Sequence, residues 1–164
     1  MHLPLDISNA AQNLAQFLSL SHSKLATAES CTGGGLAQTL TDIAGCSAWF
    51  DRGFITYSNL SKTEMLGIDA EIIQQYGAVS YEVASLMSAG ALQHSHADYA
   101  IAITGIAGPT GGSDEKPVGT IYIAVQKQHS EAIIHLEHFN GDRTEIRAQA
   151  ILKALQLIPS NDSK

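Results

Sequence analysis

The sequence predicts an α/β fold: a three-layer α/β/α sandwich around a mixed, mostly parallel sheet. Apolar segments with strand character alternate with segments of helical periodicity along the chain. Two strand-like segments, 120–125 and 132–139, follow each other closely as in a hairpin, which favours a mixed sheet over a wholly parallel one. The 164 residues, of which 45% are hydrophobic, suffice for one core, so we expect a single domain over 1–164.

The first half of the chain is expected to contain, in order, an amphipathic helix capped by Asp6 or Ser8, a strand, a helix and an aromatic-rich strand. The second helix should begin at a run of glycines and end at another glycine, because glycine readily adopts the backbone angles found at helix ends. The expected bounds are 6–20, 24–28, the segment between Gly35 and Gly45, and 48–57.

The second half is expected to contain three helices, a strand, a long loop rich in glycine and proline, two further strands and a closing helix. Their expected ranges are 59–66, 71–76, 81–94, 98–104, 105–119, 120–125, 132–139 and 142–158.

Charge and composition exclude several classes of partner. The net charge is −7 and the nine basic residues are scattered, which argues against a nucleic-acid-binding protein. The N-terminus does not resemble a signal peptide and no run of 18 apolar residues occurs, so no membrane association is expected. Cys31 and Cys46 are the only cysteines and form no CxxC pair, which favours a reduced, cytoplasmic location.

Three polar, glycine-rich junctions follow predicted strands, at 27–35, 104–119 and 140–143. Ligands of open α/β sheets bind in the crevice beyond the strand ends, so these junctions are expected to be the walls of one site.

The first junction, TAESCTGGG, contains Ser30, Thr32, Gly33 and Gly34 between a strand and a helix. Glycines here would let backbone N–H groups approach an anion at the positive end of the helix dipole. The sequence matches no standard nucleotide-binding fingerprint, and from the residues alone a tight turn without a ligand is favoured over an anion site. Cys31 is expected to be a small buried residue rather than a nucleophile.

The segment GCSAWFDRGFITYSNLSK supplies Ser47, Tyr57 and Lys62. A serine hydroxyl becomes nucleophilic when a base removes its proton, and a lysine with a lowered pKa is such a base. If Ser58 or Asn59 caps the following helix, Lys62 lies in its first turn, where the dipole opposes a positive charge. The alternative is a solvated lysine beside a tyrosine at the edge of the core.

The other two junctions supply Thr104, Gly105 and Arg143. The glycine-rich loop after Thr104 could direct N–H groups at an oxyanion, or be a mobile surface loop. In NGDRTEIR, Asp142 is expected to cap a helix, with Glu145 completing a capping box. Arginine is unfavourable at a helix start unless it binds an anion, which indicates a phosphate site at Arg143.

Metal binding is not expected. The seven histidines form no HxH or HExxH motif except the pair His94 and His96, and histidine suits the negative end of a helix dipole without any metal.

Taken together, TAESCTGG, GCSAWFDRGFITYSNLSK, GAVS, ITGIAGPTGGSDEKPVGTIYIAV and NGDR resemble the CinA C-terminal domain family, the stand-alone nicotinamide-nucleotide amidases. The resemblance covers about 14–157. It implies hydrolysis of nicotinamide mononucleotide to nicotinate mononucleotide and ammonia, without metal or cofactor. It also implies a homodimer. The alternative is a non-catalytic nucleotide-binding or regulatory module.

The resemblance further suggests roles for individual residues. Ser47 is the nucleophile, Lys62 its base and Tyr57 a proton relay, with Ser30 as the alternative nucleophile. Cys46 stands where the family often has serine, a departure that need not disturb Ser47. The substrate pocket is expected to contain Ser30, Thr32, Gly33, Gly34, Thr104, Gly105 and Arg143.

Overall fold

The computed structural model describes residues 4–161, so the first and last three residues of the predicted domain lie outside the described part. Helix and strand bounds are α1 Leu5–Leu20, β1 Leu25–Glu29, α2 Gly35–Thr41, the 3₁₀ helix η1 Cys46–Ala48, β2 Phe50–Ile55, α3 Asn59–Leu66, α4 Ala70–Tyr76, α5 Tyr81–Gln93, β3 Tyr99–Gly105, β4 Thr120–Lys127, β5 Ile133–His138 and α6 Arg143–Asn161.

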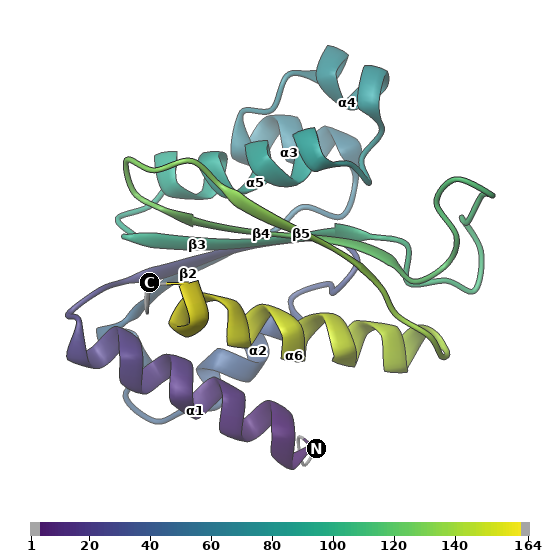
Figure 1. The fold of residues 1–164 in the computed structure, drawn as a ribbon. Coiled ribbons are helices and arrows are strands. Elements are labelled where there is room, and N and C mark those ends of the chain that lie inside the picture. The colour runs from purple at the N-terminus through teal and green to yellow at the C-terminus, as the bar shows by residue number, and fades with distance from the viewer. Residues whose placement is uncertain (1–3, 162–164) are drawn as a thin grey trace.

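The five strands form one sheet in the order β2-β1-β3-β4-β5. Strand β1 pairs in parallel with β2 and β3, whereas β4 is antiparallel to both β3 and β5. All strands except β4 therefore run in the same direction. Helices α1, α2 and α6 cover one face, and α3, α4 and α5 cover the other (Figure 1). The predicted three-layer sandwich with a mixed sheet is confirmed.

Alternation of large and small side chains along the central strands explains the two cores. Leu25, Ile101 and Ile103 point toward the α1, α2 and α6 layer, while Ala26 and Ala100 point toward α5. The small side chains let the helices of the second layer lie close. In that layer a Cβ on Gly90 of α5 would lie 2.9 Å from the Cβ of Leu66, which is why α3 and α5 can touch.

Three local predictions differ from the structure. Helix α1 begins after Pro4 and neither Asp6 nor Ser8 caps it, because Asp6 lies within the first turn. Helix α2 ends at Thr41, before the expected glycine, and η1 precedes a shorter β2. No helix of the described chain is long and apolar enough to cross a membrane.

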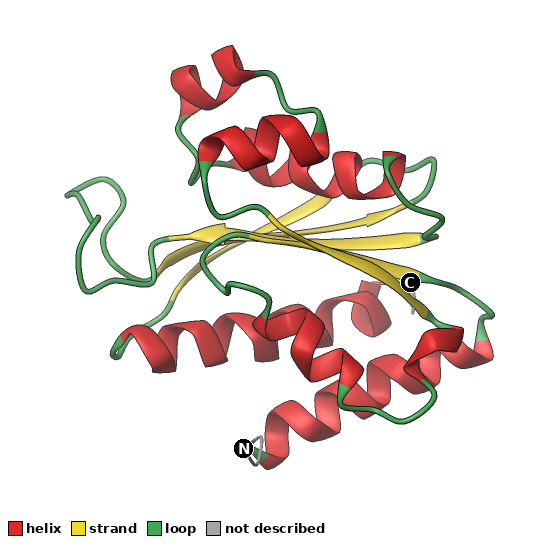
Figure 2. Ribbon diagram, turned by 180° about the vertical axis from the view of Figure 1, so that it is seen from behind, coloured by secondary structure: helices red, strands yellow, loops and turns green. Residues whose placement is uncertain are grey.

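The carboxyl ends of β1, β2 and β3 lie at one end of the sheet, together with the loop 106–119 and the start of α6 (Figures 1 and 2). This arrangement brings the three glycine-rich junctions of the sequence to the same place.

Candidate active site

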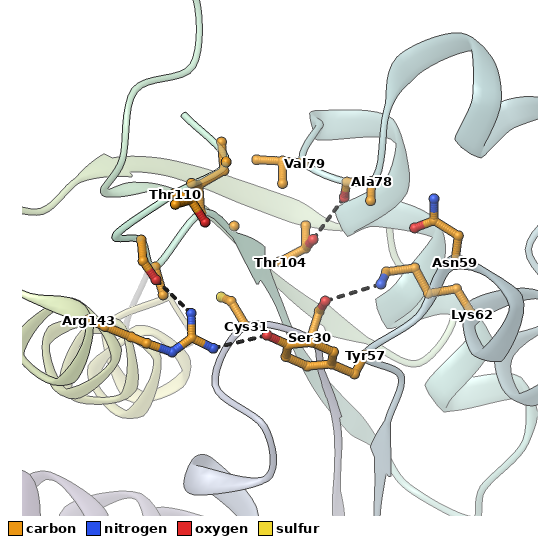
Figure 3. A pocket seen from close by; sticks show the side chains of 15 residues that line it. Ser30, Cys31, Tyr57, Asn59, Lys62, Ala78, Val79, Thr104, Thr110 and Arg143 are labelled. Atoms are coloured by element: carbon orange, nitrogen blue, oxygen red, sulfur yellow. Dashed lines mark hydrogen bonds between the residues drawn. The ribbon is translucent and has the colours of Figure 1, made fainter. Parts of the chain in front are cut away.

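A cavity of about 320 Å³ opens at this end of the sheet (Figure 3). Polar side chains from four separate parts of the chain line it, together with other residues of the segments 78–79, 104–108 and 110–111. The side chains with polar or ionisable groups are those of Ser30, Cys31, Tyr57, Asn59, Lys62, Thr104, Thr110 and Arg143.

Ser30 and Lys62 form a hydrogen-bonded pair in this cavity. Ser30 directly follows β1, and Lys62 lies on α3, whose first turn is capped by Ser58 accepting from the N–H of Ser61. The Lys62 Nζ donates to Ser30 Oγ at 3.1 Å and to the carbonyl of Thr56 at 2.8 Å. Figure 3 shows the ammonium aimed at the serine hydroxyl. Of the two candidate caps, Ser58 and Asn59, the structure has Ser58.

Burial gives Lys62 the properties of a base. Its side chain has no exposed area, and this burial lowers the pKa of the ammonium below its ordinary 10.5. The helix dipole was the expected cause, but removal from water is the main one. Both oxygens that Lys62 contacts are neutral, so neither stabilises the charged form as a carboxylate would.

Glu29 fixes the turn that carries Ser30. Its buried carboxylate accepts hydrogen bonds from the N–H groups of Gly34, Leu36 and Ala37, at 3.1, 3.0 and 2.8 Å. Glu29 thus fills the N-terminus of α2, the place where the sequence predicts a bound anion. The turn is also a tight one, with Gly34 at a φ of +93°.

The geometry of this turn therefore gives no support to the predicted anion-binding role of Thr32, Gly33 and Gly34. None of the three lines the cavity. The N–H of Gly33 donates to the Ser30 carbonyl, and the Thr32 carbonyl accepts from Arg147 at 2.8 Å. These groups build the turn, because the protein's own carboxylate already occupies the anion position.

Thr104 and Gly105 shape the opposite wall at the end of β3. The Thr104 hydroxyl donates to the carbonyl of Ala78 at 2.8 Å, which ties the segment before α5 to the sheet. A Cβ on Gly105 would lie 2.7 Å from the Thr120 carbonyl, so this position has no room for a side chain. Both residues line the cavity, and their contact with a substrate stays a prediction.

Arg143 places a second cation at the cavity. Asp142 caps α6 by accepting from the N–H groups of Thr144 and Glu145, and the Glu145 carboxylate accepts from the Asp142 N–H. The expected capping box is thus confirmed. It leaves Arg143 at the helix start, where the guanidinium donates to the Tyr57 hydroxyl at 2.9 Å and to the Gly108 carbonyl at 2.7 Å.

Ser47 lies elsewhere, and the structure does not bring it to Lys62 as the predicted pairing requires. Ser47 is an exposed residue of η1, which precedes β2, whereas Lys62 follows β2. The six residues of β2 separate the two by roughly 20 Å at the usual rise per residue. Ser30, the alternative nucleophile, is the serine that Lys62 contacts.

Two residues that support the site without lining the cavity, Glu29 and Thr56, were not singled out from the sequence. Glu29 stands before a glycine run at a helix start, a pattern that could have indicated a capping carboxylate. Thr56 contributes only its carbonyl, which no side-chain pattern reveals. Cys31 is buried, as expected, and this raises the pKa of its thiol to about 12, so the thiol stays protonated.

The cavity therefore combines a serine hydroxyl, a buried amine and a guanidinium, with no carboxylate among its lining residues. No group of three or more potential metal ligands occurs in residues 4–161. The fold and the site define an α/β protein whose serine–lysine pair is chemically suited to acyl transfer on an anionic substrate.

Comparison with known proteins gives the family. The pattern described as "CinA C-terminal domain" matches residues 7–161. "Nicotinamide-nucleotide amidohydrolase PncC" of Escherichia coli K12 is 48% identical over 93% of each chain, and the Pseudomonas putida protein of that name is 44% identical over 91% of this chain and 92% of its own. The crystal structure of "competence/damage inducible protein CihA" from Agrobacterium tumefaciens superposes with a TM-score of 0.95, at 42% identity and 99% coverage of each chain. This chain belongs to the CinA C-terminal domain family.

Proposed function

We propose that the protein hydrolyses the carboxamide of nicotinamide mononucleotide, giving nicotinate mononucleotide and ammonia in pyridine nucleotide salvage. The observation that carries this proposal is the hydrogen bond from the buried Lys62 to Ser30. The names of the relatives from Escherichia coli and Pseudomonas putida supply the substrate. The cavity of about 320 Å³ is of a size suited to a mononucleotide.

Ser30 is the nucleophile in this proposal, and Lys62 is the general base. Neutral Lys62 takes the Ser30 proton while Oγ bonds to the amide carbon, then gives that proton to the departing nitrogen, which leaves as ammonia. Water, deprotonated by Lys62, next attacks the acyl carbon, and the proton returns to Ser30 Oγ as the ester bond breaks. The N–H of Cys31, which has no backbone acceptor in the described chain, is a donor available to the oxyanion.

Tyr57 and Arg143 bind the rest of the substrate. Arg143 can still donate to a phosphate while it holds Tyr57 and Gly108, since a guanidinium carries five N–H groups. The exposed Tyr57 ring offers a face for the cationic pyridinium. Tyr57 Oη contacts Arg143, which favours this binding role over the expected proton relay. Thr104 and Gly105 complete the pocket.

The remaining features of the proposal concern the whole protein. Residues 1–164 act as a single amidase domain that needs neither metal nor cofactor. Two free cysteines, Cys31 and Cys46, suit a reduced, cytoplasmic location. The protein forms a homodimer, for which exposed apolar side chains such as those of Ile55, Leu60 and Met65 are candidate contacts.

Ammonia release from nicotinamide mononucleotide tests this function. Ser30→Ala should lower kcat by about 10³-fold or more while leaving substrate binding nearly intact, because the hydroxyl acts in the chemical step. Ser47→Ala, an exposed serine at the other end of β2, is the matched control and should retain activity. If the wild-type protein bound the nucleotide without releasing ammonia, it would be a non-catalytic binding module. If Ser30→Ala stayed active, the serine mechanism would be wrong.

A further inference from the structure

The charges around Ser30 favour an anion at the point where the carboxamide reacts. Lys62 donates two hydrogen bonds, both to neutral oxygens, and its third N–H has no acceptor in the described chain. None of the cavity-lining residues carries a carboxylate. A protonated Lys62 therefore has no counter-charge in the empty cavity.

The proposed reaction turns a neutral carboxamide into a carboxylate at this point. We propose that the carboxylate of the product forms an ion pair with Lys62, so that the protein binds its product more tightly than its substrate and is slowed by it. This inference rests on the proposed function. It adds a regulation of the same site: turnover depends on how fast another enzyme removes the product.

The second chemical step places the new oxygen beside the amine. The attacking water must lie within hydrogen-bond reach of Lys62 Nζ to lose its proton, so the C–O bond forms next to that nitrogen. Breakage of the ester bond leaves a carboxylic acid and neutral Lys62. The acid is attached to a cationic ring and is much stronger than an ammonium, so its proton moves to Lys62. Water has then supplied the new oxygen of the product. The turnover ends with the ammonium group of Lys62 beside the carboxylate of the product.

Other charged groups near Lys62 do not replace this ion pair. The ionisable side chains on α3 and on the helices packed against it include Glu64 of α3, Glu71 and Tyr76 of α4, Tyr81 and Glu82 at the start of α5, and His94 directly after its end. No hydrogen bond or ion pair joins any of them to Lys62 in the described chain. Of the neighbours on the β1 side, Glu29 is bound to α2, and Cys31 keeps its proton because burial raises the pKa of its thiol to about 12.

Arg143 does not account for the preference either. It contacts Tyr57 and Gly108 on another wall of the cavity, and its proposed partner is the phosphate. Substrate and product carry the same phosphate, so its contribution to binding cancels when the two affinities are compared.

Calorimetric titration of Ser30→Ala with each mononucleotide tests the inference, because this variant keeps Lys62 and cannot turn over the substrate. We expect nicotinate mononucleotide to bind roughly ten- to a hundredfold more tightly than nicotinamide mononucleotide, the range for a hydrogen bond between charged groups. Product binding should also take up a proton at mildly alkaline pH, detected as a binding enthalpy that changes with the ionisation enthalpy of the buffer. Substrate binding should not.

The matched variant is Ser30→Ala with Lys62→Met, which keeps a chain of similar length without the charge. The preference for the product should disappear in it. A preference that persisted, or equal affinities in Ser30→Ala, would overturn the ion pair and leave the proposed activity standing. Failure of both mononucleotides to bind would overturn the proposed substrate and this inference with it. Product inhibition of the wild-type protein, competitive with substrate, is the second measurement, and its absence would also contradict the proposal.

Discussion

Lys62 is both a fully buried residue and the general base of the proposed reaction. A lysine without exposed area normally contacts a carboxylate, yet this one contacts a hydroxyl and a carbonyl. The sequence indicated a lysine in the first turn of a helix, and that position is as predicted. Its partner could not be predicted, because Ser30 is 32 residues away and the contact depends on how β1 and β2 pair.

The lowered pKa of Lys62 predicts the pH dependence of the reaction. The neutral amine is the active form, so kcat/KM should rise with pH and level off above the pKa of Lys62. Because burial lowers that pKa, the midpoint should fall below the ordinary 10.5. Measuring kcat/KM from neutral to alkaline pH locates the midpoint.

Lys62→Arg gives the control for this pH profile. A guanidinium cannot lose its proton in this range, so the variant should be inactive at every pH. An active Lys62→Arg variant with an unchanged profile would show that another group is the base.

At the scale of elements, α2 owes its start to Glu29. Three N–H groups donate hydrogen bonds to its carboxylate, and without it they would lack partners in a buried turn. A carboxylate at a helix N-terminus is also stabilised by the dipole. The sequence predicted this helix start correctly but attributed its N–H groups to a ligand, since glycines serve a turn and an anion site equally well.

Glu29→Gln tests the role of this carboxylate. The amide NH₂ cannot accept hydrogen bonds, so either the N–H of Ala37 or the N–H groups of Gly34 and Leu36 would lose their acceptor. The free energy of unfolding should therefore fall by about 1–3 kcal/mol. The kcat should fall too, because the same turn orients Ser30. Glu64→Gln, an exposed change on α3, is the matched control and should alter neither. Urea denaturation and ammonia release measure the two effects, and an unchanged stability would contradict this account.

At the scale of the whole molecule, alternation of strands and helices predicted the layers, because the periodicity of each segment reflects which face it buries. The order of the strands in the sheet, and the distance in space between Ser47 and Lys62, were not predictable in the same way. Ser47 and Lys62 are near in sequence, but an extended strand between them sends them to opposite ends of the sheet. Closeness along a strand-containing segment is therefore a poor guide to contact.

The proposed homodimer is the prediction that belongs to this scale. Light scattering should give about twice the monomer mass of 17.4 kDa. Leu60 is 65% exposed on α3, and Leu60→Glu should lower the mass toward that of a monomer by placing a charge at the proposed contact. Leu20→Glu, at the end of α1 and 74% exposed, is the control and should leave it unchanged. A mass near 17.4 kDa for the wild-type protein would contradict the dimer.

The loop 106–119 projects away from the sheet between β3 and β4 (Figures 1 and 2). Asp114 and Glu115 are exposed and lie in a turn that the hydrogen bond from the Ser113 N–H to the Lys116 carbonyl closes. A cut between these two residues would break no helix or strand and would leave Ser30, Tyr57 and Lys62 on one fragment and Arg143 on the other. The loop is therefore a suitable place to divide the chain into the two fragments of a split enzyme. Two proteins fused to its halves would report their own association as released ammonia.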